Sequence, residues 1–269
     1  MAAPPTQYVL AIFPGFQLLD LAGPLDILNE LSESSENSQL SLTIVAETSD
    51  PVPVKPIALS SANWTFDLQA HSSQIPGRVN ASFNQYLQPD TTFADYLAAA
   101  KSGKAKADVL LIPGGIGTRL NRLHPDGSKT LNVQSLYDFL PNIAPHISTA
   151  IITVCTGSDI LAQSGLLKGR RATTNMQRYD FVAQRNPGVS WQYGARWIRS
   201  LPSEAVGTVP IEIWSSAGIS AGMDVTLAFV AHFHGGESVA TDLAKSLEYD
   251  WRQLAEGEKD PLYKRYYSI

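Results

Sequence analysis

The residue whose type and place most suggest chemistry is Cys155, the one cysteine of the 269-residue chain. It follows an apolar run, Thr149–Val154, and precedes Thr156-Gly-Ser-Asp159, where a helical pattern begins. A side chain at such a strand-to-helix turn projects at the carboxyl edge of a parallel sheet, where ligands bind. The free N–H groups at the start of the helix would also lower the pKa of the thiol. The alternative is a buried cysteine with a purely structural role.

A glycine-rich turn is expected at the same edge, because Gly114 and Gly115 end the apolar run Asp108–Pro113. Glycines let the backbone approach a substrate closely, and the N–H groups of Gly115 and Thr156 could together stabilise a developing anion. The turn lacks both the G-x-x-x-x-G-K-[ST] and the G-x-G-x-x-G spacing, so it does not predict nucleotide binding. An ordinary turn remains the alternative for these glycines.

Asp20 falls in the first turn of a predicted helix, Leu18–Leu31, just after the predicted strand Tyr8–Phe13. Its carboxylate is either a charge that stabilises the helix start or an acid/base group beside the thiol. Asp26, one and a half turns later, is expected to face solvent. The five histidines complete no catalytic triad, and one cysteine with a single His-x-His pair predicts no metal site.

Short apolar runs alternate with helical stretches, which indicates a parallel sheet covered by helices on both faces. We therefore predict a doubly wound α/β fold with the ligand crevice at the carboxyl ends of the strands. Strands are predicted at 8–13, 42–46, 108–113, 149–154, 195–199 and 211–214, and helices at 18–31, 128–140, 223–233, 239–251 and in a stretch that ends near Gly165.

The chain is predicted to be one domain, 1–269, with an insertion around 60–106 and a C-terminal helical and tail extension at 236–269. The insertion is rich in Asn, Gln, Ser, Pro and Gly without clear periodicity, and we expect a helix within it near Phe93–Ala100. The tail from Glu256 onward is expected to wrap the surface.

Charge and composition exclude several partners. Twenty Lys and Arg against 25 Asp and Glu give a net charge of −5, which disfavours nucleic-acid binding. No apolar run approaches the ~20 residues of a membrane helix, and the N-terminus lacks the basic region of a signal peptide. We expect a cytoplasmic protein that acts on a small molecule and binds neither nucleic acid nor membrane.

Five segments resemble the ThiJ/PfpI superfamily of class I glutamine-amidotransferase-like proteins, and within it most closely the isonitrile (isocyanide) hydratases. They occur in the family's order over about residues 8–235: Phe13–Asp26, Val109–Gly117, Val154–Ser158, Gly165–Thr174 and Ser216–Asp224. The resemblance implies a flavodoxin-like sheet with the nucleophile at Cys155 and an acidic partner at Asp20. It also implies that Gly114, Gly115 and Thr156 bind the substrate or its anion.

One position departs from the family pattern. Many relatives have Thr-Thr-His-Trp where this chain has Thr173-Thr-Asn-Met176, so that Asn175 stands in place of a histidine. This weakens any Cys-His mechanism and leaves Cys155 and Asp20 as the principal pair, with Asn175 at the substrate. The expected activity is a cofactor-independent hydratase that converts an isonitrile to an N-substituted formamide through a thioimidate. The alternatives are a glyoxalase- or deglycase-like enzyme on α-oxoaldehydes, or a non-catalytic redox sensor.

We also predict a homodimer, since members of the superfamily generally pair near the active site and two-fold pairs are the commonest assembly. The predicted helix 18–31 is the candidate interface, because its apolar residues exceed one stripe. Light scattering should give twice the mass of the 29.2 kDa chain. A mass of one chain across the accessible concentration range would contradict this prediction.

Overall fold

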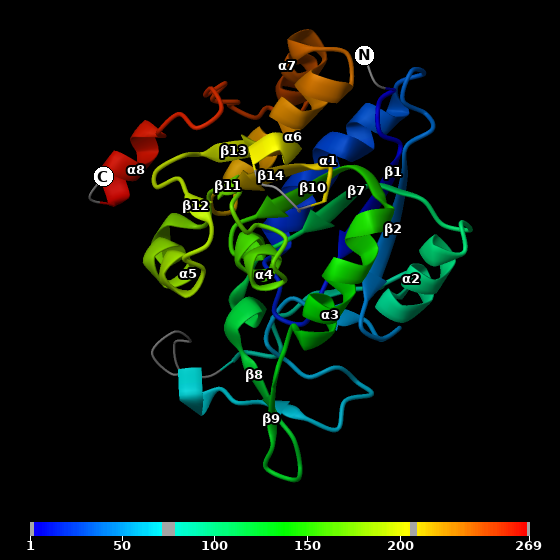
Figure 1. The fold of residues 1–269 in the computed structure, drawn as a ribbon, viewed down its shortest axis with the longest axis vertical. Helices are drawn as coiled ribbons and strands as arrows, with labels where there is room; N and C mark the ends of the chain where they lie inside the picture. The colour runs from blue at the N-terminus through cyan, green and yellow to red at the C-terminus, as the bar shows by residue number, and fades with distance from the viewer. Residues whose placement is uncertain (1–2, 72–78, 205–208, 268–269) are drawn as a thin grey trace.

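The computed structural model describes residues 3–71, 79–204 and 209–267, and within them a seven-stranded sheet forms the centre of the fold (Figure 1). The strand order is β13-β14-β10-β7-β1-β2-β6, and every neighbouring pair is parallel except β13 with β14. The strands are β1 (Gln7–Ala11), β2 (Ser41–Ala46), β6 (Thr91–Thr92), β7 (Ala107–Ile112), β10 (Ile147–Val154), β13 (Trp197–Ser200) and β14 (Glu212–Ser216).

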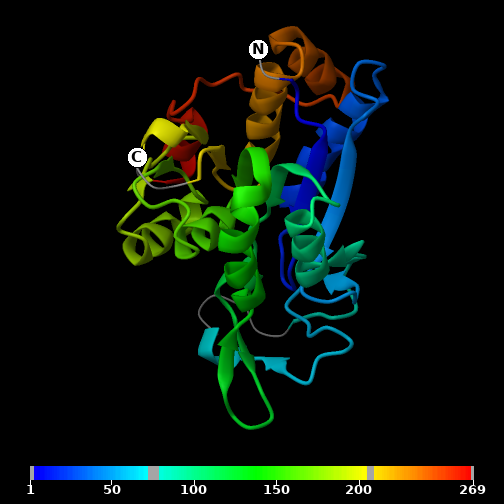
Figure 2. The same ribbon diagram turned by 45° about the vertical axis from the view of Figure 1, so that its right-hand side comes forward.

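Helices cover both faces of this sheet (Figures 1 and 2). Helices α1, α6 and α7 pack together on one face, and α2, α3 and α4 on the other. The central strands therefore meet helices on both sides and are mostly apolar and buried, as the sequence predicted for a doubly wound, mostly parallel α/β sheet. The helices are α1 (Leu18–Glu33), α2 (Phe93–Lys101), α3 (Gln134–Ile143), α4 (Gly157–Gln163), α5 (Tyr179–Arg185), α6 (Ala221–Phe233), α7 (Glu237–Ser246) and α8 (Pro261–Tyr266).

The register of the central strands brings three chain segments to one edge. Leu10 in β1 pairs with Leu111 in β7, and Ile112 in β7 pairs with Thr153 in β10. Because all three strands run in the same direction, the turns that follow them meet at their carboxyl ends. This edge is where the sequence predicted the ligand crevice.

The predicted helix at 128–140 is wrong in its first half. Lys129–Leu131 instead forms strand β9, which pairs antiparallel with β8 (Asn121–Leu123), and helix α3 starts only at Gln134. The turn between the strands has Gly127 at a φ of 82°, and the Asp126 carboxylate accepts hydrogen bonds from Ser128. This turn chemistry favours a hairpin over a helix, and the hairpin extends beyond the helical layers (Figure 2).

Residues 60–106 contribute to both the central sheet and this hairpin. Strand β4 (Thr65–Phe66) pairs with β8, and β5 (Tyr86–Leu87) pairs with β3 (Val52–Pro53). Further along, β6 forms the edge of the main sheet, and the expected helix near 93–100 is confirmed as α2. A last small sheet pairs β11 (Arg171–Ala172) with β12 (Ser190–Trp191).

The C-terminal part follows the prediction up to α7, which ends at Ser246 rather than at Trp251. After it, a buried ionic cluster ties the tail to the rest of the fold. The Arg196 guanidinium donates to Asp224 at 2.7 Å and to Asp260 at 2.8 Å, and Arg252 donates to the second oxygen of Asp260 at 2.8 Å. No helix in the described ranges is both long and apolar enough to cross a bilayer.

Replacing Asp260 should destabilise the protein markedly. Asp260 is fully buried and also caps α8 through the Leu262 N–H, so that Asp260→Ala removes one of the two carboxylates that pair with buried Arg196 and also removes the cap of α8. Losing one partner of a buried pair costs about 3–5 kcal/mol, and urea unfolding should show a loss of that size. The exposed Asp250 provides a matched control in Asp250→Ala. A change below about 1 kcal/mol in Asp260→Ala would contradict the role of this cluster.

Candidate active site

Cys155 occupies a strained turn between β10 and α4. Its φ is +59°, a left-handed conformation that costs a non-glycine residue about 1–3 kcal/mol. The surrounding backbone holds this conformation: the Cys155 N–H is shared between the carbonyls of Ser216 and Ala217, each at 3.2 Å. The Cys155 carbonyl accepts from the hydroxyls of Ser158 at 3.0 Å and Thr174 at 3.1 Å. The result is a thiol aimed at the carboxyl edge of the sheet, as the sequence predicted.

Asp20 lies beside this thiol, in the first turn of α1, and is 2% exposed. Its Oδ2 accepts a hydrogen bond from the Gly114 N–H at 2.9 Å. The Cys155 thiol and the Ile219 N–H also interact with the carboxyl group, although buried Oδ1 makes no hydrogen bond of regular geometry. Asp20 is therefore a buried carboxyl group in contact with the thiol rather than a solvated charge at a helix start. Asp26, in contrast, is exposed as expected.

Burial governs the protonation of this pair. It raises the pKa of Asp20 to about 7, against the opposing effects of the Gly114 N–H and the thiol. Burial and the neighbouring Asp20 charge also raise the pKa of the Cys155 thiol, although the Thr156 N–H and the Asn175 amide oppose this. The lowered thiol pKa expected from the sequence is therefore wrong in direction. Around neutral pH the pair carries at most one negative charge and keeps a shared proton.

Gly115 and Thr156 meet as predicted, but they bond to each other. The Gly115 N–H donates to the Thr156 hydroxyl at 3.1 Å, and the Thr156 N–H interacts with the Cys155 sulfur. Gly114 makes the close approach possible, because a Cβ there would lie 2.5 Å from the Thr156 nitrogen. Of the Gly115 and Thr156 N–H groups, that of Thr156 is therefore the one that faces the sulfur, and the Thr156 hydroxyl donates back to the Gly115 carbonyl at 3.3 Å.

Asn175, in the loop after β11, also contacts the Cys155 sulfur. Its Nδ2 donates to the Cys155 sulfur at 3.2 Å, and its Oδ1 is buried without a hydrogen-bond partner. An amide cannot take the thiol proton, so Asn175 can orient the sulfur but cannot act as its base. Among the described residues, no histidine lines the cavity, and no three metal-ligating side chains converge.

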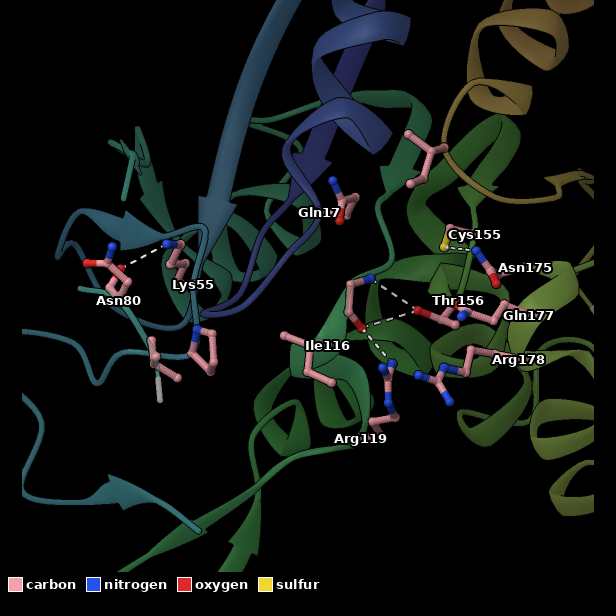
Figure 3. A pocket seen from close by; sticks show the side chains of 14 residues that line it. Gln17, Lys55, Asn80, Ile116, Arg119, Cys155, Thr156, Asn175, Gln177 and Arg178 are labelled. Carbon is pink, nitrogen blue, oxygen red and sulfur yellow. Dashed lines mark hydrogen bonds between the residues drawn. The ribbon is translucent and has the colours of Figure 1, made fainter. Parts of the chain in front are cut away.

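The cavity above Cys155 has a volume of about 440 Å³ (Figure 3). Gly115, Thr156 and Asn175 line it, whereas Asp20 is not among the lining residues. Sequence reasoning missed its charged wall, which is formed by Lys55, Arg119 and Arg178. The sequence held a signal for the two arginines, because each follows a predicted site residue within about one helical turn. Arg119 lies four residues after Gly115, and Arg178 lies three residues after Asn175. Lys55 comes from a distant loop and had no such signal.

The sequence matches no family model, but individual proteins are similar over most of the chain. An isonitrile hydratase of Pseudomonas putida is 26% identical over 254 residues, which cover 90% of this chain and 78% of that protein. Among solved structures, a ThiJ/PfpI family protein of Pseudomonas syringae has a TM-score of 0.57 at 20% identity, covering all of this chain and 86% of that one. DJ-1beta of Drosophila melanogaster has a TM-score of 0.56 at 15% identity, covering 91% and 99%.

Because the pKa of Asp20 is raised in the folded protein, the free energy of unfolding should depend on pH. The folded protein holds the Asp20 proton up to about pH 7, whereas the unfolded chain releases it near its ordinary pKa of 3.8. Wild-type stability therefore falls as pH rises between these values, by up to roughly 4 kcal/mol. Asp20→Asn removes this loss, so the free energy of unfolding of the variant relative to wild type should increase from pH 4 to pH 8.

Urea unfolding at several pH values measures this difference, with Asp26→Asn, on an exposed turn of the same helix, as the control. A difference between Asp20→Asn and wild type that stays constant from pH 4 to pH 8 would show that Asp20 ionises as it does in the unfolded chain.

Proposed function

Because this chain belongs to the DJ-1/ThiJ/PfpI superfamily and pairs a buried thiol with a buried carboxyl group, we propose that it is a cofactor-independent hydratase of small isonitriles. The product is an N-substituted formamide. The observation that carries the proposal is the contact of Asp20 with Cys155, in a site that holds one shared proton. The similarity to an isonitrile hydratase supports the choice of substrate.

The first step forms a bond between the Cys155 sulfur and the terminal carbon of the isonitrile. The thiol passes its proton to the Asp20 carboxylate as the sulfur attacks, so that a free thiolate need not accumulate in the buried site. The protonated Asp20 then donates this proton to the same carbon, which gives a thioimidate and restores the carboxylate. A sulfur nucleophile suits the soft isonitrile carbon better than a hydroxyl does.

The second step hydrolyses the thioimidate. Asp20 removes a proton from a water molecule as its oxygen adds to the carbon, and the nitrogen of the substrate gains the proton. The resulting tetrahedral intermediate loses its hydroxyl proton to Asp20 and expels the Cys155 thiolate, which releases the formamide. One water is consumed, and the pair returns with one proton.

Three groups assist these steps. The Thr156 N–H and the Asn175 amide both donate toward the sulfur and stabilise the thiolate when it leaves. The Thr156 hydroxyl accepts a hydrogen bond from the Gly115 N–H and donates to the Gly115 carbonyl, so that it holds the glycine turn beside the sulfur. The strained backbone of Cys155 keeps the sulfur fixed, because its N–H and C=O are both bonded to neighbouring elements.

The proposal predicts that Cys155→Ala abolishes the hydration of isonitriles and that Asp20→Asn slows it by at least ~100-fold, a typical contribution of a general acid/base. For the wild type, kcat/KM should rise with pH and level off above about pH 7, because the reactive pair must first lose one proton. In Asp20→Asn the rise should move to higher pH, since the buried thiol must then ionise alone. Formamide release from a panel of isonitriles measures these rates, with Asp26→Asn as the control.

Three results would contradict the proposal. Full activity in Asp20→Asn would remove Asp20 from the mechanism. Turnover of methylglyoxal that survives Asp20→Asn, without formamide from any isonitrile, would favour an oxoaldehyde enzyme. A change of oligomeric state with peroxide, without turnover of either substrate class, would favour a redox sensor.

A further inference from the structure

The cavity over Cys155 is basic, although the whole chain has a net charge of −5. Three cationic side chains line it, Lys55, Arg119 and Arg178, and no Asp or Glu of the described residues lies on its wall. Figure 3 shows the two arginines below Cys155 and Thr156, with Lys55 across the cavity. Lys55 already bonds to the carbonyl of Asn80 at 2.8 Å. A concave site lined by one sign of charge concentrates ligands of the opposite sign.

The two arginines lie close enough to repel each other. Arg119 donates to the Gly115 carbonyl at 3.3 Å, which places it beside the glycine turn at Gly114 and Gly115. Burial and the positive charge of Arg178 lower the pKa of Arg119 to about 10, so that both groups stay charged at neutral pH. A negative charge on Cys155 and the charge of Asp159 both act on the pKa of Arg119 in the opposite direction.

Arg178 differs from three other buried or partly buried arginines, each of which pairs with a carboxylate. Arg196 has Asp224 and Asp260 as partners, Arg122 has Glu47, and Arg171 has Glu204. The side chain of Arg178, in contrast, makes no hydrogen bond or ion pair with any described residue. A half-buried guanidinium next to a like charge, without a carboxylate, is unfavourable unless an anion joins it.

We propose that the substrate of this site carries a carboxylate that binds between Arg119 and Arg178 while its reactive carbon meets the Cys155 sulfur. The planar forks of the two guanidinium groups match a carboxylate and give charge-assisted hydrogen bonds. A cavity of about 440 Å³ holds a small molecule of this kind. The carboxylate site does not depend on the reaction, but the substrate class, an isonitrile acid, rests on the proposed function.

Alkylation of Cys155 tests the carboxylate site without any turnover. Iodoacetate and iodoacetamide react with the same sulfur and differ in charge, and the chain has no other cysteine. For each reagent, the rate of alkylation of Cys155 is divided by its rate of alkylation of N-acetylcysteine. The ratio of the two normalised rates, iodoacetate over iodoacetamide, does not depend on the pKa of the thiol. We expect this ratio to favour iodoacetate by about 10-fold, the value of one charge-assisted hydrogen bond. It should fall to near one in Arg178→Gln and recover in part in Arg178→Lys.

The matched control is Lys104→Gln, which removes one positive charge from an exposed turn away from the cavity. The ratio should be the same in this variant as in wild type. Thermal unfolding of each variant checks that the fold is retained. A wild-type ratio near one, or a preference that Arg178→Gln and Lys104→Gln change equally, would overturn the carboxylate site.

Kinetics with isocyanoacetate and its methyl ester then test the substrate class. The acid should have a KM at least about 10-fold lower than the ester, and Arg178→Gln should remove this preference. If iodoacetate is preferred but neither isonitrile is hydrated, the carboxylate site stands and the proposed function fails. If both isonitriles are hydrated equally and iodoacetate is not preferred, the function stands and the carboxylate site fails.

Discussion

The site depends on a shared proton between a thiol and a carboxyl group that are both removed from water. Two adjacent anions are disfavoured there, so the pair stays singly charged near neutral pH, with the pKa of Asp20 raised to about 7. The geometry around the pair follows from this constraint. Cys155 adopts a positive φ at the carboxyl edge of the sheet. Gly114 passes so close to Thr156 that a side chain at position 114 would collide with the Thr156 backbone.

The same constraint divides the cavity into two sides. On the inner side, the Asp20 carboxyl group contacts the sulfur and does not line the cavity. On the outer side, the arginines bring positive charge to a site that gains a negative charge whenever the pair loses its proton. The carboxyl group beside the thiol and the positive charges of the cavity wall therefore belong to different elements. Asp20 is in α1, whereas Arg119 and Arg178 follow the turns after β7 and β11.

The carboxyl-edge placement of Cys155, Asp20, Gly115 and Thr156 was predictable, since each follows a strand of one parallel sheet and parallel strands end together. The hairpin at 121–131 was missed because apolar residues with helical spacing concealed the Asp126-Gly127 turn. The direction of the thiol pKa could not be derived either. A helix start lowers the pKa of a thiol, but the burial of the Cys155 sulfur and its contact with Asp20 depend on the tertiary structure. The charged wall was missed because single basic residues in loops have no periodicity.

The infrared spectrum of the protein as a function of pH tests the shared proton most directly, because the S–H stretch has one source in a chain with a single cysteine. We predict that this band persists from about pH 5 to about pH 9. Over the same range, a carboxylic acid band that is absent in Asp20→Asn should disappear around pH 7. Loss of the S–H band below about pH 7, while the Asp20 acid band remains, would mean that the resting site is a thiolate beside a neutral acid. That result would contradict the account.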